Sequence, residues 1–319
     1  MSVAAVAIGR NEGARLTACL SSLKGAVAPI VYVDSGSTDG SVAAARALGA
    51  DVVELDLSVP FTAARARNAG LDRLRETAPD CRYVQFLDGD CTLAPGWIAE
   101  AHAVLEADDA LAVVCGRRRE KFPEASLWNR MIDAEWDTPV GAARACGGDA
   151  LMRRAALDDV GGYRDDMIAG EEPEMCFRMR QKGWRILRID AEMTAHDAGL
   201  TRFAQWWQRS RRAGHAYAEG AALHGTESPE RYNMREVIRA VAWGMLLPAV
   251  ALLGAVFLTP WALALLLGWP VQVLRLKGSG NSWSGAFFLT LGKVAEAQGI
   301  MTYWWRRATG QSRRLIEYK

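Results

Sequence analysis

Two aspartates separated by one glycine follow an apolar run, and carboxylates so placed can hold a hard cation. The run YVQFL leads into Asp88-Gly89-Asp90, which predicts two carboxylates at the end of a core strand. Mg²⁺ and Mn²⁺ prefer oxygen ligands and commonly bridge a carboxylate and a phosphate. Acidic turns have the same composition, but the position after a core strand favours a metal site at Asp88 and Asp90.

A histidine follows a later apparent strand, WRILRID, and stands among acidic residues. His196 is therefore a candidate for a further metal or diphosphate ligand. A hydrogen-bonded loop histidine is the alternative.

Three carboxylates open a helical stretch at Glu171, Glu172 and Glu174. The helix dipole favours acidic residues at this position, so a structural role is one reading. A general base within reach of a hydroxyl, typically worth about 10²- to 10⁴-fold in rate, is the other. Glu172 is the preferred base and Glu171 the second choice, and Pro173 fits the first helical turn.

Polar residues after the first three strands are candidates for binding a nucleotide. Asp34 ends the second strand and can accept hydrogen bonds from a base or a ribose, while Ser37 or Thr38 can cap the helix that follows. A capped turn explains this loop equally well. Arg67-Asn68 could add a phosphate or ribose contact, or Arg67 could be a solvated helix arginine. The loops at the strand ends supply the other candidates, Asn11, Glu12 and Ser35.

An aromatic and cationic segment follows at Gln205-Trp206-Trp207-Gln208-Arg209, with Arg211-Arg212 behind it. This segment could hold a diphosphate, stack on a sugar or contact anionic lipid headgroups, and the sequence does not favour one of these three roles.

The elements that must position these residues alternate between apolar runs and amphipathic helical stretches. Strands are expected at 3–8, 30–34, 52–56, 83–88 and 112–116, with helices near 13–24, 38–48, 62–76 and 96–107. Strands separated by helices pair in parallel through right-handed crossovers, which predicts a Rossmann-like α/β sheet flanked by helices. Ligands bind at the carboxyl ends of such strands, where the polar motifs fall.

The composition limits the partners and the compartment. The 319 residues carry a net charge of +1, so nothing indicates a nucleic-acid partner, and phosphate binding must be local. The six cysteines form no C-x-x-C pair and are expected to be small core residues in a reducing compartment. The stretch from Ser2 to Gly9 lacks a basic n-region, so no signal peptide is expected and the N-terminal domain stays in the cytoplasm.

The chain changes character near residue 230, which predicts one domain at 1–230 and a membrane-associated region at 231–319. No charge occurs between Val241 and Leu274, and Pro248 and Pro260 interrupt this run. Two short spans, about 238–258 and 260–275, are expected to form a hairpin (about 238–275). A buried helical pair and a re-entrant hairpin are the alternatives.

The residues around the hairpin predict its orientation. Arg235 and Arg239 precede it and Arg275 and Lys277 follow it, which places both flanks on the cytoplasmic side. Its tryptophans, Trp243, Trp261 and Trp269, suit a membrane interface. The stretch at about 286–307 is typical of an amphipathic helix that lies on a bilayer, ending in Arg306-Arg307. A helix packed on the first domain is the alternative.

The motifs together resemble the family 2 glycosyltransferases with the GT-A fold. They occur in that family's order over about residues 3–215: IGRNE, VDSGSTDG, ARARNAG, LDGD, GGDALMRR, GEEPEMCFRMRQKGW and His196. The resemblance implies that Asp34 contacts the base, that Asp88 and Asp90 hold the metal, and that Glu172 is the base. Gly148-Asp149 match a donor-sugar or acceptor loop. Many members have Glu-Asp where this chain has Glu171-Glu172, so which glutamate acts stays open.

The tail RRLIEYK is similar to the succinoglycan-type exopolysaccharide branch of that family. The processive Q-x-x-R-W motif is met only in part, by Gln205 and Arg209 followed by Ser210. The resemblance therefore implies inverting, Mg²⁺- or Mn²⁺-dependent single additions from a UDP- or GDP-linked sugar to a lipid-linked acceptor. The expected place is the cytoplasmic face of the bacterial inner membrane. A catalytically silent nucleotide-binding scaffold of an envelope-glycan complex is the alternative function.

Overall fold

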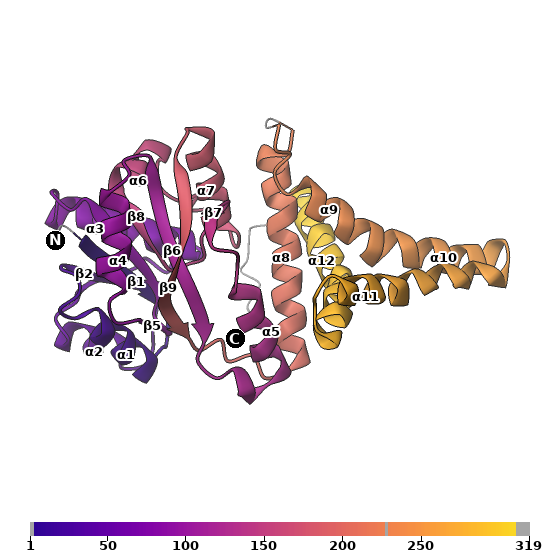
Figure 1. Cartoon of the computed structure of the whole chain (residues 1–319), viewed down its shortest axis with the longest axis horizontal. Helices are drawn as coiled ribbons and strands as arrows, with labels where there is room; N and C mark the ends of the chain where they lie inside the picture. The colour runs from indigo at the N-terminus through magenta and orange to yellow at the C-terminus, as the bar shows by residue number, and fades with distance from the viewer. Residues whose placement is uncertain (1–2, 227–228, 311–319) are drawn as a thin grey trace. The chain divides into compact units, whose positions relative to one another are not determined.

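The first of two units, which ends at Thr201, is built on a nine-stranded mixed sheet (Figure 1). The computed structural model describes residues 3–226 and 229–310. The strands are β1 (Val3–Gly9), β2 (Ile30–Asp34), β3 (Asp51–Glu54), β4 (Tyr83–Asp88), β5 (Cys91–Leu93), β6 (Leu111–Glu120), β7 (Gly141–Ala143), β8 (Ala150–Arg153) and β9 (Arg185–His196). The helices are α1 (Ala14–Leu23), α2 (Ser41–Ala47), α3 (Ala63–Thr77), α4 (Trp97–Glu106), η1 (Pro123–Ala125), α5 (Leu127–Trp136), α6 (Arg154–Val160) and α7 (Glu171–Gln181).

The strand order is β3-β2-β1-β4-β8-β6-β9-β5, with β7 beside β9. Strands β1 to β4 pair in parallel, as the alternation of strands and helices predicts. Beyond β4 the sheet is mixed, because β8 runs antiparallel to both β4 and β6. Strand β1 is buried along nearly its whole length, as expected of a continuous apolar run in a parallel sheet. The predicted α/β fold is therefore confirmed.

The register of the parallel strands brings the polar motifs to one edge of the sheet. Gly9 of β1 lies opposite Asp34 of β2, and Ile8 lies opposite Asp88 of β4. The prediction that Ser37 or Thr38 caps the next helix is wrong, because α2 begins only at Ser41 and its preceding residue is Gly40. All six cysteines are buried and free, as predicted.

The second unit starts at Arg202 and is helical. It contains α8 (Phe203–His224), α9 (Met234–Val241), the π-helical turn η2 (Ala242–Leu246), α10 (Leu247–Phe257), η3 (Pro260–Leu267), α11 (Gly268–Gly278) and α12 (Trp283–Thr309). Helix α8 packs on α12, so it belongs with the second unit although it precedes residue 230. The RRLIEYK tail lies outside the described residues.

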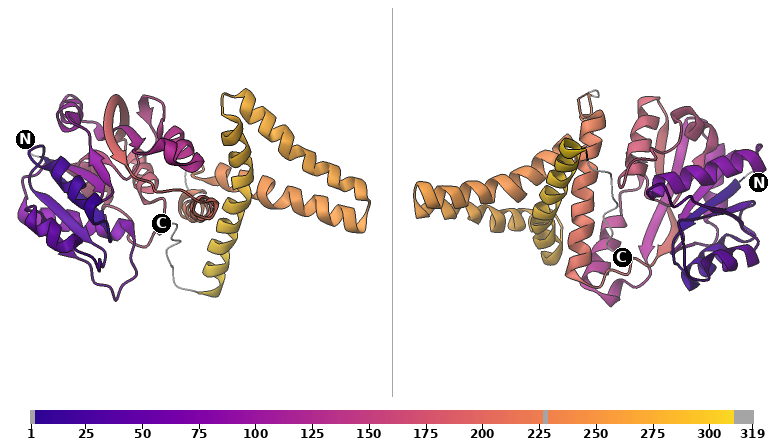
Figure 2. Two further views of the ribbon diagram at one scale, coloured as in Figure 1. Left: turned by 90° about the horizontal axis from the view of Figure 1, so that it is seen from below. Right: turned by 180° about the vertical axis from the view of Figure 1, so that it is seen from behind.

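Helices α9 and α10 and the turn between them form one continuous helix, Met234–Phe257. Of the described helices, this one is long and apolar enough to cross a membrane, judged by length and composition. The chain reverses at Leu258 and Thr259, and η3 then packs back on α10. The views in Figure 2 show this hairpin, whose two segments match those expected from the sequence, although Pro248 lies inside the first helix and does not interrupt it.

Candidate active site

The loops that follow β1 and β2 are joined by side-chain hydrogen bonds. The backbone of Asn11 donates to Ser37 Oγ at 2.9 Å, and the backbone of Thr38 donates to Asn11 Oδ1 at 2.7 Å. Glu12 pairs with Arg15 at 2.7 Å and is also packed near Gly9 and Gly89. Both predicted donor-binding residues of the first loop therefore lie at the expected sheet edge.

Asp34 is buried, and its own loop satisfies both of its carboxylate oxygens. Oδ1 accepts from Tyr32 Oη at 3.0 Å and from Ser37 Oγ at 2.5 Å. Oδ2 accepts from the backbone of Gly36 and of Ser37 at 2.9 and 2.8 Å. The neighbouring Ser35 is only 2% exposed. Asp34 therefore closes its own loop by accepting hydrogen bonds from Gly36 and Ser37, and its contact with a base stays a prediction.

Arg67 is the hub of the site, because its buried guanidinium contacts three carboxylates. Nη1 lies 2.9 Å from an oxygen of Glu171 and 2.9 Å from an oxygen of Glu172, while Nη2 lies 2.9 Å from Asp88 Oδ1. The Arg67 side chain is 2% exposed, so it is not a solvated helix arginine. It joins the strand end of β4 to the first turn of α7.

A second arginine, Arg118 of β6, holds the other side of the Asp88 carboxylate. Its Nη2 lies 3.2 Å from Asp88 Oδ2 and 2.8 Å from His196 Nδ1, and its Nε lies 3.3 Å from Asp149 Oδ2. Burial alone would raise the pKa of Asp88, but the charges of Arg67 and Arg118 outweigh burial and hold that pKa below its usual range. Asp88 is therefore ionised.

Asp90 and His196 form a buried pair at the end of β9. His196 Nε2 lies 3.1 Å from Asp90 Oδ2, and the imidazole stacks on Trp136 with ring centroids 4.9 Å apart. An arginine can only donate, so His196 Nδ1 accepts from Arg118. That places a proton on Nε2, from which it is donated to Asp90.

Gly148 and Asp149 lie against Arg67 and Asp88. Asp149 accepts from the backbone of Asp88 at 3.3 Å and from Thr194 Oγ1 at 2.7 Å. A Cβ atom at Gly148 would lie 2.7 Å from Arg67 Nη2 and 3.0 Å from Asp88 Oδ2. Only glycine therefore lets the 147–149 loop approach the cluster.

Glu172 has the ionisation expected of a general base. Gly170, with a φ of 79°, ends the preceding loop and α7 begins at Glu171. Burial raises the pKa of Glu172 to about 7, although the nearby charge of Arg67 opposes that rise. Near neutral pH this carboxyl group can both accept and release a proton. Glu174, in contrast, is tied to Arg178 at 2.8 Å.

The donor set fits a hard divalent cation. Ligand atoms of Asp90, Cys91 and His196 lie within 4.8 Å of one another, as do those of Asp88, Cys91 and Asp149. Burial raises the pKa of the Cys91 thiol well above its usual range, and soft sulfur does not suit hard cations such as Mg²⁺ or Mn²⁺. The remaining donors are mainly carboxylate oxygens, which suit Mg²⁺ or Mn²⁺.

Sequence reasoning missed Arg118 and Trp136. The signal for Arg118 was the run Arg117-Arg118-Arg119 directly after the expected strand 112–116. If the strand continues through this run, Arg118 faces the opposite side of the sheet from Arg117 and Arg119. Conversely, Asn68 does not face the cluster. It binds the loop at Tyr163 through its side-chain oxygen and nitrogen, at 3.0 and 2.8 Å.

Two predicted donor-binding residues lie in the second unit. Gln205 Oε1 accepts from the backbone of Arg202 at 3.0 Å in the first turn of α8, and Arg209 lies one turn further on. Their role at the donor stays a prediction.

Comparison with known proteins gives a family match over the first half of the chain. The model described as glycosyl transferase family 2 matches residues 6–161, which include Asp34, Asp88 and Asp90 but not Glu172. The pre-mycofactocin glycosyltransferase of Mycobacterium tuberculosis is 28% identical over 234 residues, 67% of this chain. The chain spans about half (46%) of that relative's length. The succinoglycan biosynthesis protein ExoA of Rhizobium meliloti is 26% identical over 278 residues, 80% of this chain and 81% of the relative.

Solved structures show the same fold. The mannosyltransferase PcManGT from Pyrobaculum calidifontis, in complex with GDP-Man and Mn²⁺, is 19% identical with a TM-score of 0.66 over 96% of this chain and 88% of that one. S. aureus TarS 1–349 is 14% identical with a TM-score of 0.54 over 98% and 93%. At these identities the likeness is one of fold.

Proposed function

Because the chain belongs to the family 2 glycosyltransferases and has their GT-A fold, we propose that it transfers a sugar from a nucleoside diphosphate sugar to a lipid-linked acceptor. The observation that carries this proposal is the single cluster in which Arg67 joins Asp88 to Glu172. The cluster thereby holds Asp88, a candidate ligand of the diphosphate-bound metal, close to Glu172, a candidate base with a pKa of about 7. Sugar transfer needs both functions.

Asp88 and Asp90 would hold Mg²⁺ or Mn²⁺, with His196 and Asp149 beside them. When bound, the cation would neutralise the charge of the leaving diphosphate. The Mn²⁺ and GDP-Man in the structure of the similar mannosyltransferase support this assignment, and a UDP-linked donor is supported by TarS bound to UDP-GlcNAc.

Glu172 would take the proton of the acceptor hydroxyl while that oxygen attacks the anomeric carbon. The carbon–oxygen bond to the diphosphate breaks on the opposite face, so the configuration inverts. The proton ends on Glu172 and the electron pair leaves with the diphosphate. Arg67, which contacts Glu172 at 2.9 Å, fixes the position of the carboxylate.

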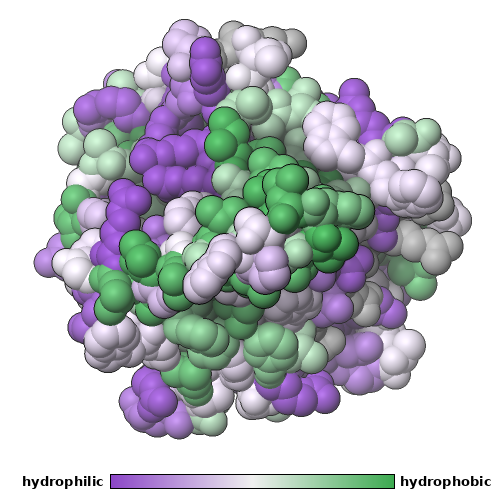
Figure 3. All heavy atoms as spheres, turned by 90° about the vertical axis from the view of Figure 1, so that its right-hand side faces the viewer, coloured by the Kyte–Doolittle hydropathy of each residue, from purple (hydrophilic) through white to green (hydrophobic). Residues whose placement is uncertain are grey.

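The acceptor would be a lipid-linked glycan at the cytoplasmic face of the bacterial inner membrane. The apolar hairpin supports this, since its side chains are widely exposed and Figure 3 shows hydrophobic residues gathered on the face where it ends. Basic residues flank the hairpin on both sides, which favours a cytoplasmic orientation. The similarity to a succinoglycan biosynthesis protein supports an exopolysaccharide product.

The test is release of nucleoside diphosphate by membranes that contain the full chain, assayed with a panel of UDP- and GDP-linked sugars and Mn²⁺. We expect Asp90→Ala to abolish release and metal-dependent nucleotide binding, and exposed Asp80→Ala to leave both unchanged. Full activity of Asp90→Ala would remove this aspartate from the mechanism. A wild-type chain that binds nucleotide with metal but turns over no donor would instead support the scaffold reading.

A further inference from the structure

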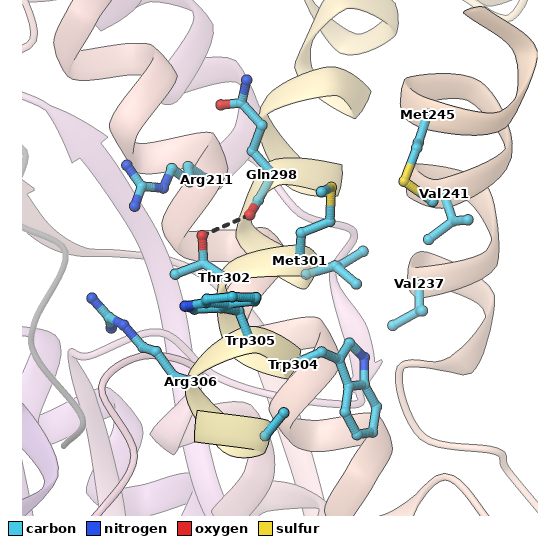
Figure 4. Close-up of a pocket in the computed structure, with 12 residues that line it drawn as sticks. Arg211, Val237, Val241, Met245, Gln298, Met301, Thr302, Trp304, Trp305 and Arg306 are labelled. Atoms are coloured by element: carbon cyan, nitrogen blue, oxygen red, sulfur yellow. Dashed lines mark hydrogen bonds between the residues drawn. The ribbon is translucent and has the colours of Figure 1, made fainter. Parts of the chain in front are cut away.

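The second unit contains a groove between α9 and α12 that the proposed reaction does not use (Figure 4). Its volume is about 990 Å³, at the upper end of the roughly 300–1,000 Å³ of small-molecule sites. Residues of three helices, all within the second unit, line it, so its shape does not depend on the first unit.

One wall of the groove is apolar. Val237, Val241 and Met245 come from the helix Met234–Phe257, which is long and apolar enough to cross a membrane, and they face Met301 and Trp304 of α12. Figure 4 shows these side chains turned toward one another across the gap. Such a wall can take a hydrocarbon chain but has few partners for a polar ligand.

The opposite rim is cationic. Arg211 of α8 and Arg306 of α12 extend on the same side of the groove in Figure 4, with the Gln298 side chain above them. The Arg211 guanidinium donates to a neutral group, Gln208 Oε1, at 3.3 Å. Guanidinium groups bind phosphate oxygens in a bidentate manner. The groove thus has an apolar wall and a cationic rim.

We propose that this groove binds one anionic phospholipid of the bilayer, with an acyl chain along Val241 and Met301 and the phosphate between Arg211 and Arg306. The charge of the rim selects a negatively charged headgroup over a zwitterionic one. The inference rests on the proposed membrane association of the second unit, and it is independent of glycosyl transfer. The bound lipid would hold α9 against α12 at the base of the hairpin.

The experiment is native mass spectrometry of the full chain in detergent, with phosphatidylglycerol or phosphatidylcholine added. We expect one phosphatidylglycerol to be retained by the wild type and far less phosphatidylcholine. Val241→Trp fills the groove and should abolish retention. Val250→Trp, which places the same side chain at an exposed position of α10 outside the groove, should not.

The rim is tested by the double variant Arg211→Gln with Arg306→Gln, which should bind phosphatidylglycerol about ten- to thirtyfold more weakly. Arg212→Gln, a neighbouring arginine that does not line the groove, is the matched control. Equal retention of both lipids by the wild type, or unchanged retention by Val241→Trp with a native circular dichroism spectrum, would overturn the proposal. So would retention that appears only after deletion of residues 311–319, because that segment would then be the occupant.

Sedimentation with vesicles separates this inference from the one on which it rests. If the wild type sediments with vesicles but retains no lipid, the groove proposal fails and membrane association stands. If it does not sediment at all, both fail.

Discussion

At the scale of single residues, the site is a balance of buried charges. Asp88, Glu171 and Glu172 crowd around Arg67, and Arg118 adds a second cation between Asp88 and Asp149. Buried carboxylates this close cannot all ionise without such cations. At Asp88 the charges of Arg67 and Arg118 outweigh burial and hold the pKa low, whereas at Glu172 burial outweighs the charge of Arg67 and raises the pKa.

The raised pKa of Glu172 predicts a pH dependence. Below about pH 7 the carboxyl group is protonated and cannot accept a proton, so kcat/KM should fall about tenfold per pH unit toward acid and level off above pH 7. Glu172→Gln should lower turnover about 10²- to 10⁴-fold and remove this acidic limb while nucleotide still binds. Initial rates from pH 5 to 9 measure both effects. Glu171→Gln should keep the fall of kcat/KM toward acid pH. If this fall instead survives in Glu172→Gln and disappears in Glu171→Gln, Glu171 is the base.

The position of Arg118 predicts a competition with the metal. Its guanidinium lies 3.2 Å from Asp88 and 3.3 Å from Asp149, where it repels an incoming cation. Arg118→Gln should therefore bind Mn²⁺ about tenfold more tightly, measured by calorimetry or electron paramagnetic resonance without donor. Arg119→Gln is the matched control, because exposed Arg119 pairs with Glu192 and not with the cluster. Weaker Mn²⁺ binding by Arg118→Gln would show that this arginine organises the ligands and does not oppose the metal.

At the scale of elements, local pattern accounts for the first half of the sheet but not for the second. Strands β1 to β4 are continuous apolar runs joined by short connections and helices, so their order and polar ends follow from the sequence. Strand β8 is only four residues long, and its place between β4 and β6 depends on contacts across the sheet. The arginine run 117–119 marks Arg118 as a charged strand residue, but its approach to Asp88 depends on that long-range pairing, which local pattern does not predict.

Helices α8 and α12 pack through glycine, and this contact predicts a stability effect. A Cβ atom at Gly299 would lie 2.0 Å from the carbonyl oxygen of Arg211, and one at Gly214 would lie 2.0 Å from that of Glu296. Gly299→Ala must force the helices apart, so it should lower the free energy of unfolding by about 1–3 kcal/mol or more. Urea unfolding followed by circular dichroism measures this. Gly278→Ala, where no atom lies within 4 Å, is the control, and equal stability of the two variants would contradict the contact.

At the scale of the whole molecule, the exposed apolar residues at the tip of the hairpin favour a location at a membrane. Val256, Phe257, Leu258 and Trp261 are 75%, 76%, 86% and 85% exposed. A soluble protein rarely leaves so contiguous an apolar surface open to water. Insertion into a bilayer would remove this surface from water, and the basic residues on either side of the hairpin would meet the headgroups.

Charges placed at this tip should detach the protein from membranes. Placing an aspartate inside the hydrocarbon of a bilayer costs up to roughly 2.5–3.5 kcal/mol on insertion scales, so Val256→Asp with Phe257→Asp should move most of the chain into the supernatant after a high-salt wash. The fold should survive, because both side chains are already largely exposed. Leu57→Asp adds the same charge at a residue of the first unit that is 68% exposed, and this variant should stay with the membrane. A high-salt wash screens surface ion pairs, so wild-type protein that leaves the membrane in salt alone is held by charge and not by the hairpin.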